Sequence, residues 1–135
     1  MYTSSNKRIM SVIARVVPEV EFIVDGDDVK NPKPDPEGYL QAMRCLGVGP
    51  EEVVIIEDSV PGTDSASATG AVVLAVPLLG RPGAAPRRVL REGGLAGLDF
   101  AGLEKIWRNL NLDSEPETFQ GGQQKVPQPP GGNTE

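Results

Sequence analysis

The stretch from Glu51 to Gly70 constrains the fold of this chain more than any other part of the sequence. It contains the apolar run 53–56, whose β-branched residues predict a strand buried on both faces, as in a parallel sheet. Glu57 and Asp58 follow at once, and small residues then predict a helix that ends at Gly70. Open α/β sheets bind ligands beyond the carboxyl ends of their strands, so these two acids mark a candidate site.

The acidic pair has two interpretations. Adjacent carboxylates in one crevice repel each other, and a hard cation such as Mg²⁺ would hold both Glu57 and Asp58 ionised. The other interpretation is an ordinary solvated strand end, with Asp58 or Ser59 acting as the N-cap of the helix that follows. This stretch alone leaves both open.

Helical and strand-like patterns alternate along the chain. Apolar spacing and breaker residues predict helices at 6–17, 35–47, 86–91 and 103–110, and one more between the strand at 53–57 and Gly70. The same patterns predict strands at 21–24, 53–57, 71–76 and 95–100. Such alternation is typical of an α/β fold with a doubly wound, Rossmann-like parallel sheet in a three-layer α/β/α sandwich. We expect residues 1–112 to form this single core domain.

The segment 31–36, which contains Lys33, is rich in proline. Three prolines within 31–36 predict an extended segment around Lys33, and Asp35 with Pro36 predicts a helix start. Gly47 is expected to end that helix. Its buried face is expected to comprise Tyr39, Leu40, Met43 and Leu46.

The carboxyl-terminal segment 113–135 has a different composition, dominated by Gly, Pro, Gln, Ser and Glu. Such a segment buries too little apolar surface to offset its ordering entropy, so we expect it to be disordered.

Composition narrows the partners and the setting. The net charge of -6 argues against nucleic acid or an anionic membrane as a partner. The chain has no histidine, and its single cysteine, Cys45, rules out an intrachain disulfide or a cysteine-rich zinc site. No apolar run is long enough to span a bilayer. An intracellular, cytoplasmic location is expected, with an organelle left open.

Three polar segments follow strands or a strand-like start, and a parallel sheet would gather them at one edge. They are the hydroxyl cluster Thr3-Ser4-Ser5, the loop with Lys33, and the pair Glu57-Asp58. Hydroxyls beside a helix N-terminus suit a phosphate, a lysine adds positive charge, and the acids suit Mg²⁺ if another carboxylate and waters complete the octahedron. Taken singly, Lys33 could be an exposed loop lysine, and Thr3 could belong to a frayed terminus.

In combination these segments resemble the carboxyl-terminal half of the haloacid dehalogenase-like (HAD) hydrolase superfamily, in its phosphatase and β-phosphoglucomutase-like branch. The resemblance covers roughly residues 1 to 110. It is carried by Lys33-Pro34-Asp35-Pro36, Tyr39-Leu40-Gln41-Ala42, Val54 to Ser59, Gly62, Ala66 and Gly70-Ala71.

The resemblance implies a role for each segment. Thr3 and Ser4 match the second family motif, which binds the transferring phosphoryl group of a phosphorylated small-molecule substrate. Lys33 matches the third motif, the lysine that steadies the charge of the nucleophile and the phosphate. Glu57 and Asp58 match the fourth motif, whose acids bind Mg²⁺.

The sequence departs from the family pattern at its start. The first family motif, DxDGT, supplies the aspartate nucleophile and the acid/base, and no such motif stands in the 135 residues. The cap domain that selects substrate is absent as well. Asp25-Gly26-Asp27 is no substitute, because the complete signature of a hydrophobic strand, DxD and Gly-Thr is not present and because it lies between the second and third motifs.

Two functional hypotheses follow from this departure. In the first, a full-length form transfers phosphoryl groups through an aspartyl-phosphate, and this chain is an incomplete, truncated sheet that is inactive alone. In the second, the chain is a non-catalytic binding or regulatory fragment, or pseudoenzyme, whose exposed sheet edge is covered by a protein partner.

Overall fold

The computed structural model describes residues 1–5, 19 and 21–112 of the chain. The helix expected at 6–17 and the tail at 113–135 lie outside the described residues. No helix in the described part is long and apolar enough to cross a membrane.

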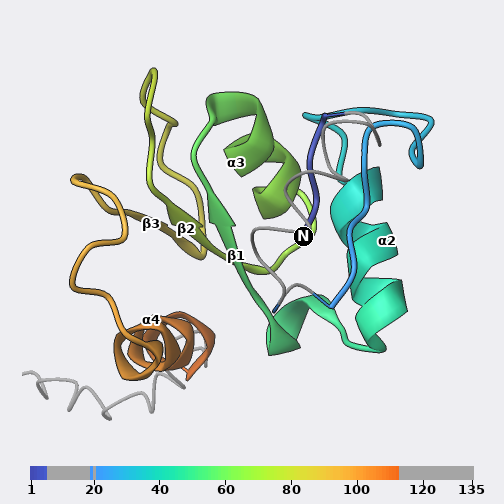
Figure 1. The fold of residues 1–135 in the computed structure, drawn as a ribbon. Coiled ribbons are helices and arrows are strands. Elements are labelled where there is room, and N and C mark those ends of the chain that lie inside the picture. Colours follow the sequence, from blue (N-terminus) through green and yellow to red (C-terminus); the bar gives the residue numbers. More distant parts are fainter. Residues whose placement is uncertain (6–18, 20, 113–135) are drawn as a thin grey trace, which may run out of the picture.

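The described chain forms an α/β fold around a three-stranded parallel sheet (Figure 1). The strands are β1 (Val54–Glu57), β2 (Val72–Ala75) and β3 (Arg88–Leu90), in the order β1-β2-β3. The helices are α2 (Glu37–Leu46), α3 (Val60–Ser67) and α4 (Phe100–Leu112), with a short 3₁₀ helix, η1, at Pro50–Glu52. The predicted Rossmann-like parallel architecture is therefore confirmed.

The helices cover both faces of the sheet. Ile55 and its register partner Val73 belong to the core cluster with α2 and α3. Successive strand residues point to opposite faces, so Val54 faces the other way. Val54 lines a groove with Trp107 of α4, which places α4 on the face opposite α2 and α3. This is the three-layer arrangement that the alternating pattern predicts.

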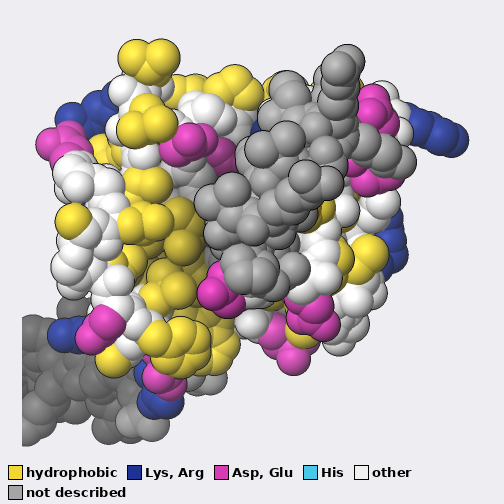
Figure 2. Space-filling model, viewed as in Figure 1, with side chains coloured by type: hydrophobic (Ala, Val, Ile, Leu, Met, Phe, Trp, Pro, Cys, Tyr) yellow, Lys and Arg dark blue, Asp and Glu magenta, His cyan; other side chains and the backbone are white. Residues whose placement is uncertain are grey.

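The central strand is β2, and its apolar residues are all buried. The expectation that β1 is buried on both faces is wrong, because Ile56 remains 40% exposed. Among the described strands β1 lies at the edge of the sheet, and α4 covers its outer face only in part. Figure 2 shows the result as a band of hydrophobic side chains that runs along the strands toward α4.

The helix α2 ends where the sequence indicates. Gly47 adopts a left-handed conformation with φ of 70°, and its N–H donates to the carbonyl of Arg44. Tyr39 and Met43 are buried as predicted, whereas Leu40 and Leu46 are exposed at 36% and 48%. The buried stripe of α2 is therefore narrower than the apolar pattern suggests.

The region between β2 and α4 differs from prediction. Residues 86–91 are not helical, because Arg88–Leu90 pair with Val73–Ala75 as the parallel strand β3. Pairing with a fully buried strand overrides the local helical pattern here. No strand forms at 95–100, because turns with left-handed glycines at 93, 94 and 97 lead into α4. The strand expected at 21–24 is reduced to one parallel bridge between Val24 and Tyr2.

Gly38, in the first turn of α2, provides a test of how closely the chain segments pack. A Cβ at this position would overlap the ring of Tyr2, which lies directly on the helix backbone. Alanine in place of glycine usually stabilises a helix by about 1 kcal/mol. Here we expect Gly38→Ala to lower the free energy of unfolding by about 1–3 kcal/mol, because Tyr2 must move out of the core. Urea denaturation followed by circular dichroism measures this. Unchanged or increased stability would mean that Tyr2 does not pack on α2.

Candidate functional site

The site is built around a buried ion pair at the carboxyl end of β1. Lys33 Nζ lies 2.5 Å from Oε1 of Glu57, and the two side chains are only 13% and 5% exposed. The Lys33 loop is a turn and not the extended segment expected, because the N–H of Asp35 donates to the carbonyl of Pro32. The helix α2 begins at Glu37, one residue later than predicted, and the Asp35 carboxylate still accepts from the N–H of Glu37 as a capping residue would. The structure thus brings together two predicted site residues that are 24 positions apart.

Tyr39 is a third member of this site that sequence reasoning assigned only to the core. Its hydroxyl donates a hydrogen bond to Oε1 of Glu57, the same oxygen that Lys33 contacts. Burial, and then the hydrogen bond to Glu57, raise the pKa of Tyr39 far above that of an ordinary tyrosine, so it stays a donor at any working pH. We call Lys33, Tyr39 and Glu57 the lysine cluster.

Two aromatic rings surround the lysine. The Tyr2 and Tyr39 rings form an edge-to-face pair with centroids 4.9 Å apart. Lys33 Nζ lies 4.6 Å from the Tyr2 centroid and 5.3 Å from that of Tyr39. A cation over an aromatic face is stabilised by the ring quadrupole, so these rings help to hold the Lys33 ammonium in its place beside Glu57.

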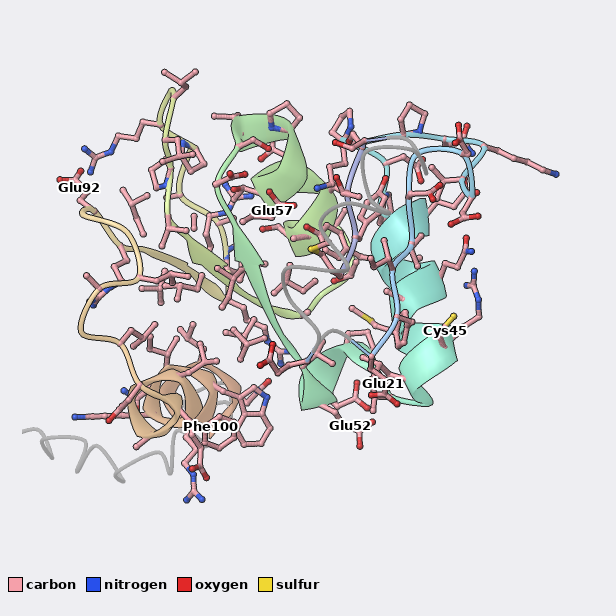
Figure 3. The ribbon with its side chains drawn as sticks, in the orientation of Figure 1. Glu21, Cys45, Glu52, Glu57, Glu92 and Phe100 are labelled. Carbon is pink, nitrogen blue, oxygen red and sulfur yellow. The ribbon has the colours of Figure 1, made fainter. Side chains whose placement is uncertain are left out.

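The second oxygen of Glu57 faces the start of α3. Oε2 accepts from the N–H of Asp58 at 3.2 Å and from the hydroxyl of Ser59 at 3.4 Å. Ser59 is the N-cap of α3, and its Oγ accepts from the N–H of Gly62 at 3.1 Å. Figure 3 shows Glu57 at the end of β1 next to α3. Of the two capping candidates that the sequence offered, Asp58 and Ser59, the N-cap is Ser59. The buried carboxylate of Glu57 lies where a helix N-terminus favours negative charge.

Asp58 is the exposed member of the acidic pair. No described residue hydrogen-bonds to its carboxylate, whereas its backbone carbonyl accepts from the N–H of Leu78 at 3.0 Å. Within residues 1–5, 19 and 21–112, no group of three or more His, Cys, Asp or Glu is placed to hold a metal ion. Mg²⁺ is commonly bound through one or two protein carboxylates, with water and substrate oxygens completing its shell. The exposed carboxylate of Asp58 fits that mode of binding, whereas both oxygens of Glu57 already accept from two donors each.

The hydroxyl cluster at the start of the chain is linked to the lysine cluster through Tyr2. Thr3 pairs its N–H with the carbonyl of Val24 at 3.0 Å, and its Oγ1 accepts from the N–H of Ser5 at 3.1 Å. Ser4 is exposed. The described contacts therefore tie Thr3 to its own turn, next to the residue whose ring contacts Lys33.

The acidic loop at 25–28 is a structural turn. Asp25 is buried at 4% exposure, and its Oδ1 accepts from the N–H of Asp27 at 2.9 Å. Its N–H donates to Oδ2 of Asp28, and the N–H of Gly26 donates to the carbonyl of Ser5. These contacts account for the Asp-Gly-Asp sequence as a turn that supports the hydroxyl cluster.

The fold and site together define an α/β protein with a lysine and acids at the carboxyl edge of a parallel sheet. The family described as haloacid dehalogenase-like hydrolase matches residues 4–76, more than half of the 135-residue chain. The chain belongs to this family.

Individual relatives match over shorter stretches. A phosphorylated carbohydrates phosphatase of Thermotoga maritima is 50% identical over 50 residues, which cover 37% of this chain and 23% of that protein. Hexitol phosphatase A of Escherichia coli is 40% identical over 60 residues, covering 44% of this chain and 28% of that protein. The chain thus spans about a quarter of each of these curated relatives.

A solved structure supports the fold over most of the chain. A HAD hydrolase of family IA, variant 3, from Entamoeba histolytica superimposes with a TM-score of 0.66 at 20% identity. The match covers 80% of this chain and 52% of that one. At this level of identity the likeness concerns the fold alone.

Proposed function

We propose that this chain supplies the phosphate- and metal-binding half of a phosphoryl-transfer domain of the phosphatase or phosphomutase type. The observation that carries the proposal is the lysine cluster, a buried Lys33–Glu57 pair at the carboxyl edge of the sheet with Asp58 exposed beside it. The membership of the HAD-like family and the phosphatase relatives support it. The substrate class is a phosphorylated small molecule.

Each candidate residue has a proposed task. Lys33 places a fixed positive charge where charge develops on the transferring phosphoryl group. Thr3 and Ser4 hold phosphoryl oxygens through their hydroxyl groups, because the N–H of Thr3 already donates to the carbonyl of Val24. Asp58 would hold Mg²⁺, which when bound neutralises phosphate charge, and Glu57 would join it as a ligand only by releasing one of its present donors.

The nucleophile lies outside these residues. The 135 residues contain no DxDGT sequence, and the aspartyl-phosphate route of the full-length form needs that motif. We therefore propose that the chain is inactive by itself.

The first experiment measures hydrolysis of p-nitrophenyl phosphate by the 135-residue chain, with and without Mg²⁺, beside a form extended by an amino-terminal DxDGT strand. We expect no turnover by the chain and Mg²⁺-dependent turnover by the extended form, lost in Lys33→Ala. Activity of the chain alone would contradict the need for an added nucleophile and would direct attention to Asp25 and Asp27. Inactivity of a folded extended form would contradict the proposed function.

Asp58→Asn separates metal binding from folding. Because the Asp58 side chain is exposed and no described residue bonds to it, we expect the free energy of unfolding to change by less than about 0.5 kcal/mol. Mg²⁺ binding by the extended form, measured by titration calorimetry, should weaken by at least about tenfold with the loss of the carboxylate charge. Unchanged Mg²⁺ affinity would remove Asp58 from the proposed metal site.

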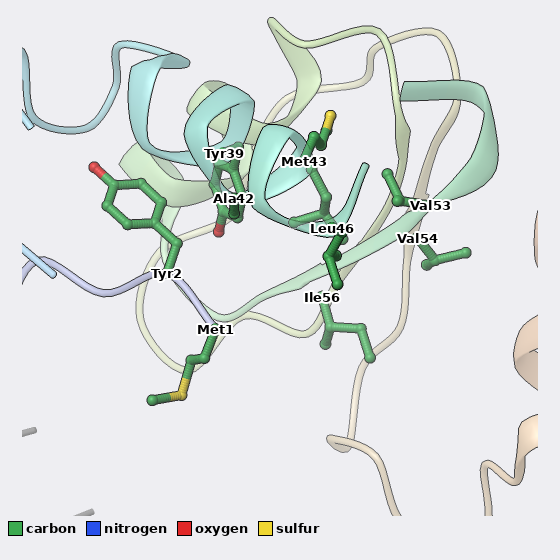
Figure 4. Close-up of a pocket in the computed structure, with 10 residues that line it drawn as sticks. Met1, Tyr2, Tyr39, Ala42, Met43, Leu46, Val53, Val54 and Ile56 are labelled. Atoms are coloured by element: carbon green, nitrogen blue, oxygen red, sulfur yellow. The ribbon is translucent and has the colours of Figure 1, made fainter. Parts of the chain in front are cut away.

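A second candidate function is a non-catalytic binding or regulatory fragment. The observation that favours it is the outer edge of β1, with which no described strand pairs. An apolar groove of about 260 Å³ lies along this edge, between β1, α2 and the first two residues (Figure 4). Unpaired strand edges favour pairing with another chain. Light scattering and gel filtration test this, because a monodisperse monomer with normal cooperative unfolding would count against a required partner.

A further inference from the structure

The hydroxyl of Tyr39 makes a contact that packing of its ring does not require. The ring lies in the core, and the hydroxyl extends from α2 to the end of β1, where it donates to Oε1 of Glu57. A phenylalanine would fill the same space without this bond. The hydroxyl therefore contributes something more specific than burial.

Glu57 needs partners on both of its oxygens to keep one orientation. Oε2 is held by the N–H of Asp58 and the hydroxyl of Ser59, both at the start of α3. Oε1 is held by Lys33, which reaches it on a flexible four-carbon side chain, and by Tyr39. Tyr39 is the stiffer of these two donors, because a tyrosine side chain has only two rotatable χ angles and α2 fixes its backbone.

We propose that Tyr39 is a positioning residue whose hydroxyl fixes the Glu57 carboxylate and thereby holds the Lys33 ammonium at the carboxyl edge of β1. This inference rests on the proposed function, since it assigns to Tyr39 the placement of the charge that meets the phosphoryl group. Tyr39 acts through Glu57 and Lys33 and need not touch substrate.

The chain contains a matched control in Tyr2. Its ring packs edge-to-face on Tyr39, and its hydroxyl is buried and makes no hydrogen bond to Glu57. Tyr39→Phe and Tyr2→Phe each remove one buried hydroxyl and keep the ring. Only the first of them removes a bond to Glu57.

The test compares lysine accessibility in the native 135-residue chain by limiting acetylation and mass spectrometry. Lys30 and Lys105 are exposed and serve as internal references. We expect Lys33 to be labelled much more slowly than these references, and its rate to rise by about tenfold in Tyr39→Phe, as the loss of one bond to a charged group implies. In Tyr2→Phe the rate should stay at the wild-type value. Urea denaturation of each variant shows whether it is fully folded under the labelling conditions. Faster labelling of Lys33 in a fully folded variant then reports a change in the native state and not global unfolding.

A second measurement separates this inference from the proposed function. Binding of inorganic phosphate with Mg²⁺ is followed by NMR shifts of the backbone amides in the wild type, Lys33→Ala and Tyr39→Phe. Phosphate binding lost in Lys33→Ala and weakened about tenfold in Tyr39→Phe supports both proposals. If the wild type does not bind phosphate, the proposed function is contradicted but the positioning role of Tyr39 is not. That role is decided by the labelling of Lys33. Equal labelling of Lys33 in Tyr39→Phe and the wild type overturns the positioning role.

Discussion

Replacing Lys33 with methionine is expected to lower the free energy of unfolding by about 3–5 kcal/mol. Methionine keeps an unbranched apolar side chain, one atom shorter than that of lysine, and lacks the ammonium group that lies over the rings of Tyr2 and Tyr39, so the change removes mainly the charge. Glu57, with a side chain only 5% exposed, then remains as a buried carboxylate without its counter-charge. Urea denaturation followed by circular dichroism at neutral pH measures the loss.

The control for this substitution is Lys30→Met. Lys30 lies three positions earlier and is exposed, and its backbone N–H, which the substitution keeps, donates to the carboxylate of Glu37. We expect that variant to stay within about 0.5 kcal/mol of the wild type. The double variant Lys33→Met with Glu57→Gln should recover part of the loss, because the uncompensated charge is gone. Strictly additive effects of the two single substitutions would mean that the ion pair is not formed.

Sequence reasoning predicted the parts of the fold that depend on local pattern. The β-branched run before Glu57 forms β1, the run after Gly70 forms β2, and the left-handed Gly47 ends α2. The apolar runs of β-branched residues indicate the two strands, and the left-handed glycine indicates the end of the helix. In each case the local signal agrees with the fold that forms.

The errors fall where tertiary contacts decide. Residues 86–91 carry a short pattern that is compatible with a helix, and β3 forms there because its backbone pairs with β2. Arg88 is held further by Asp64 and Ser67 of α3, at 3.1 and 2.8 Å. These contacts join segments more than 20 positions apart, and no periodicity within a window of ten residues contains them.

The site was predictable in its ionic part and not in its aromatic part. The expectation that loops after parallel strands meet at one edge brought Lys33 and Glu57 together in the prediction. The structure does bring them together, although only a single bridge at Val24 precedes the Lys33 loop. Tyr39 lies at a core position of α2, and its helical spacing indicates burial alone. Whether its hydroxyl reaches Glu57 depends on how α2 packs against β1. The one available signal was a tyrosine at a position where the apolar pattern would accept phenylalanine, since buried tyrosines usually have a hydrogen-bond partner.

Gly62→Ala is expected to lower the free energy of unfolding by about 1–3 kcal/mol and to open the lysine cluster. Gly62 lies in the first turn of α3, and a Cβ at this position would overlap the Glu57 carboxylate. A free glutamate could swing aside at little cost. This one is held by Lys33 and Tyr39, so the added methyl group must break those bonds or displace the start of the helix.

Making the Gly62→Ala substitution in two forms of the protein, the wild type and Glu57→Asp, distinguishes a clash with the carboxylate from a displacement of the start of α3. In a Glu57→Asp background the carboxylate is one methylene shorter, so adding alanine at Gly62 should cost much less than in the wild type. Gly83→Ala is the control, because the site is exposed, its φ is not positive and no atom lies within 4 Å of the added Cβ. An equal cost in both backgrounds would mean that Gly62 is required for the geometry of α3 and not for the close approach of Glu57. A cost that vanishes with the shortened acid would show that the carboxylate presses on the helix start, and that this glycine keeps the acid within reach of Lys33.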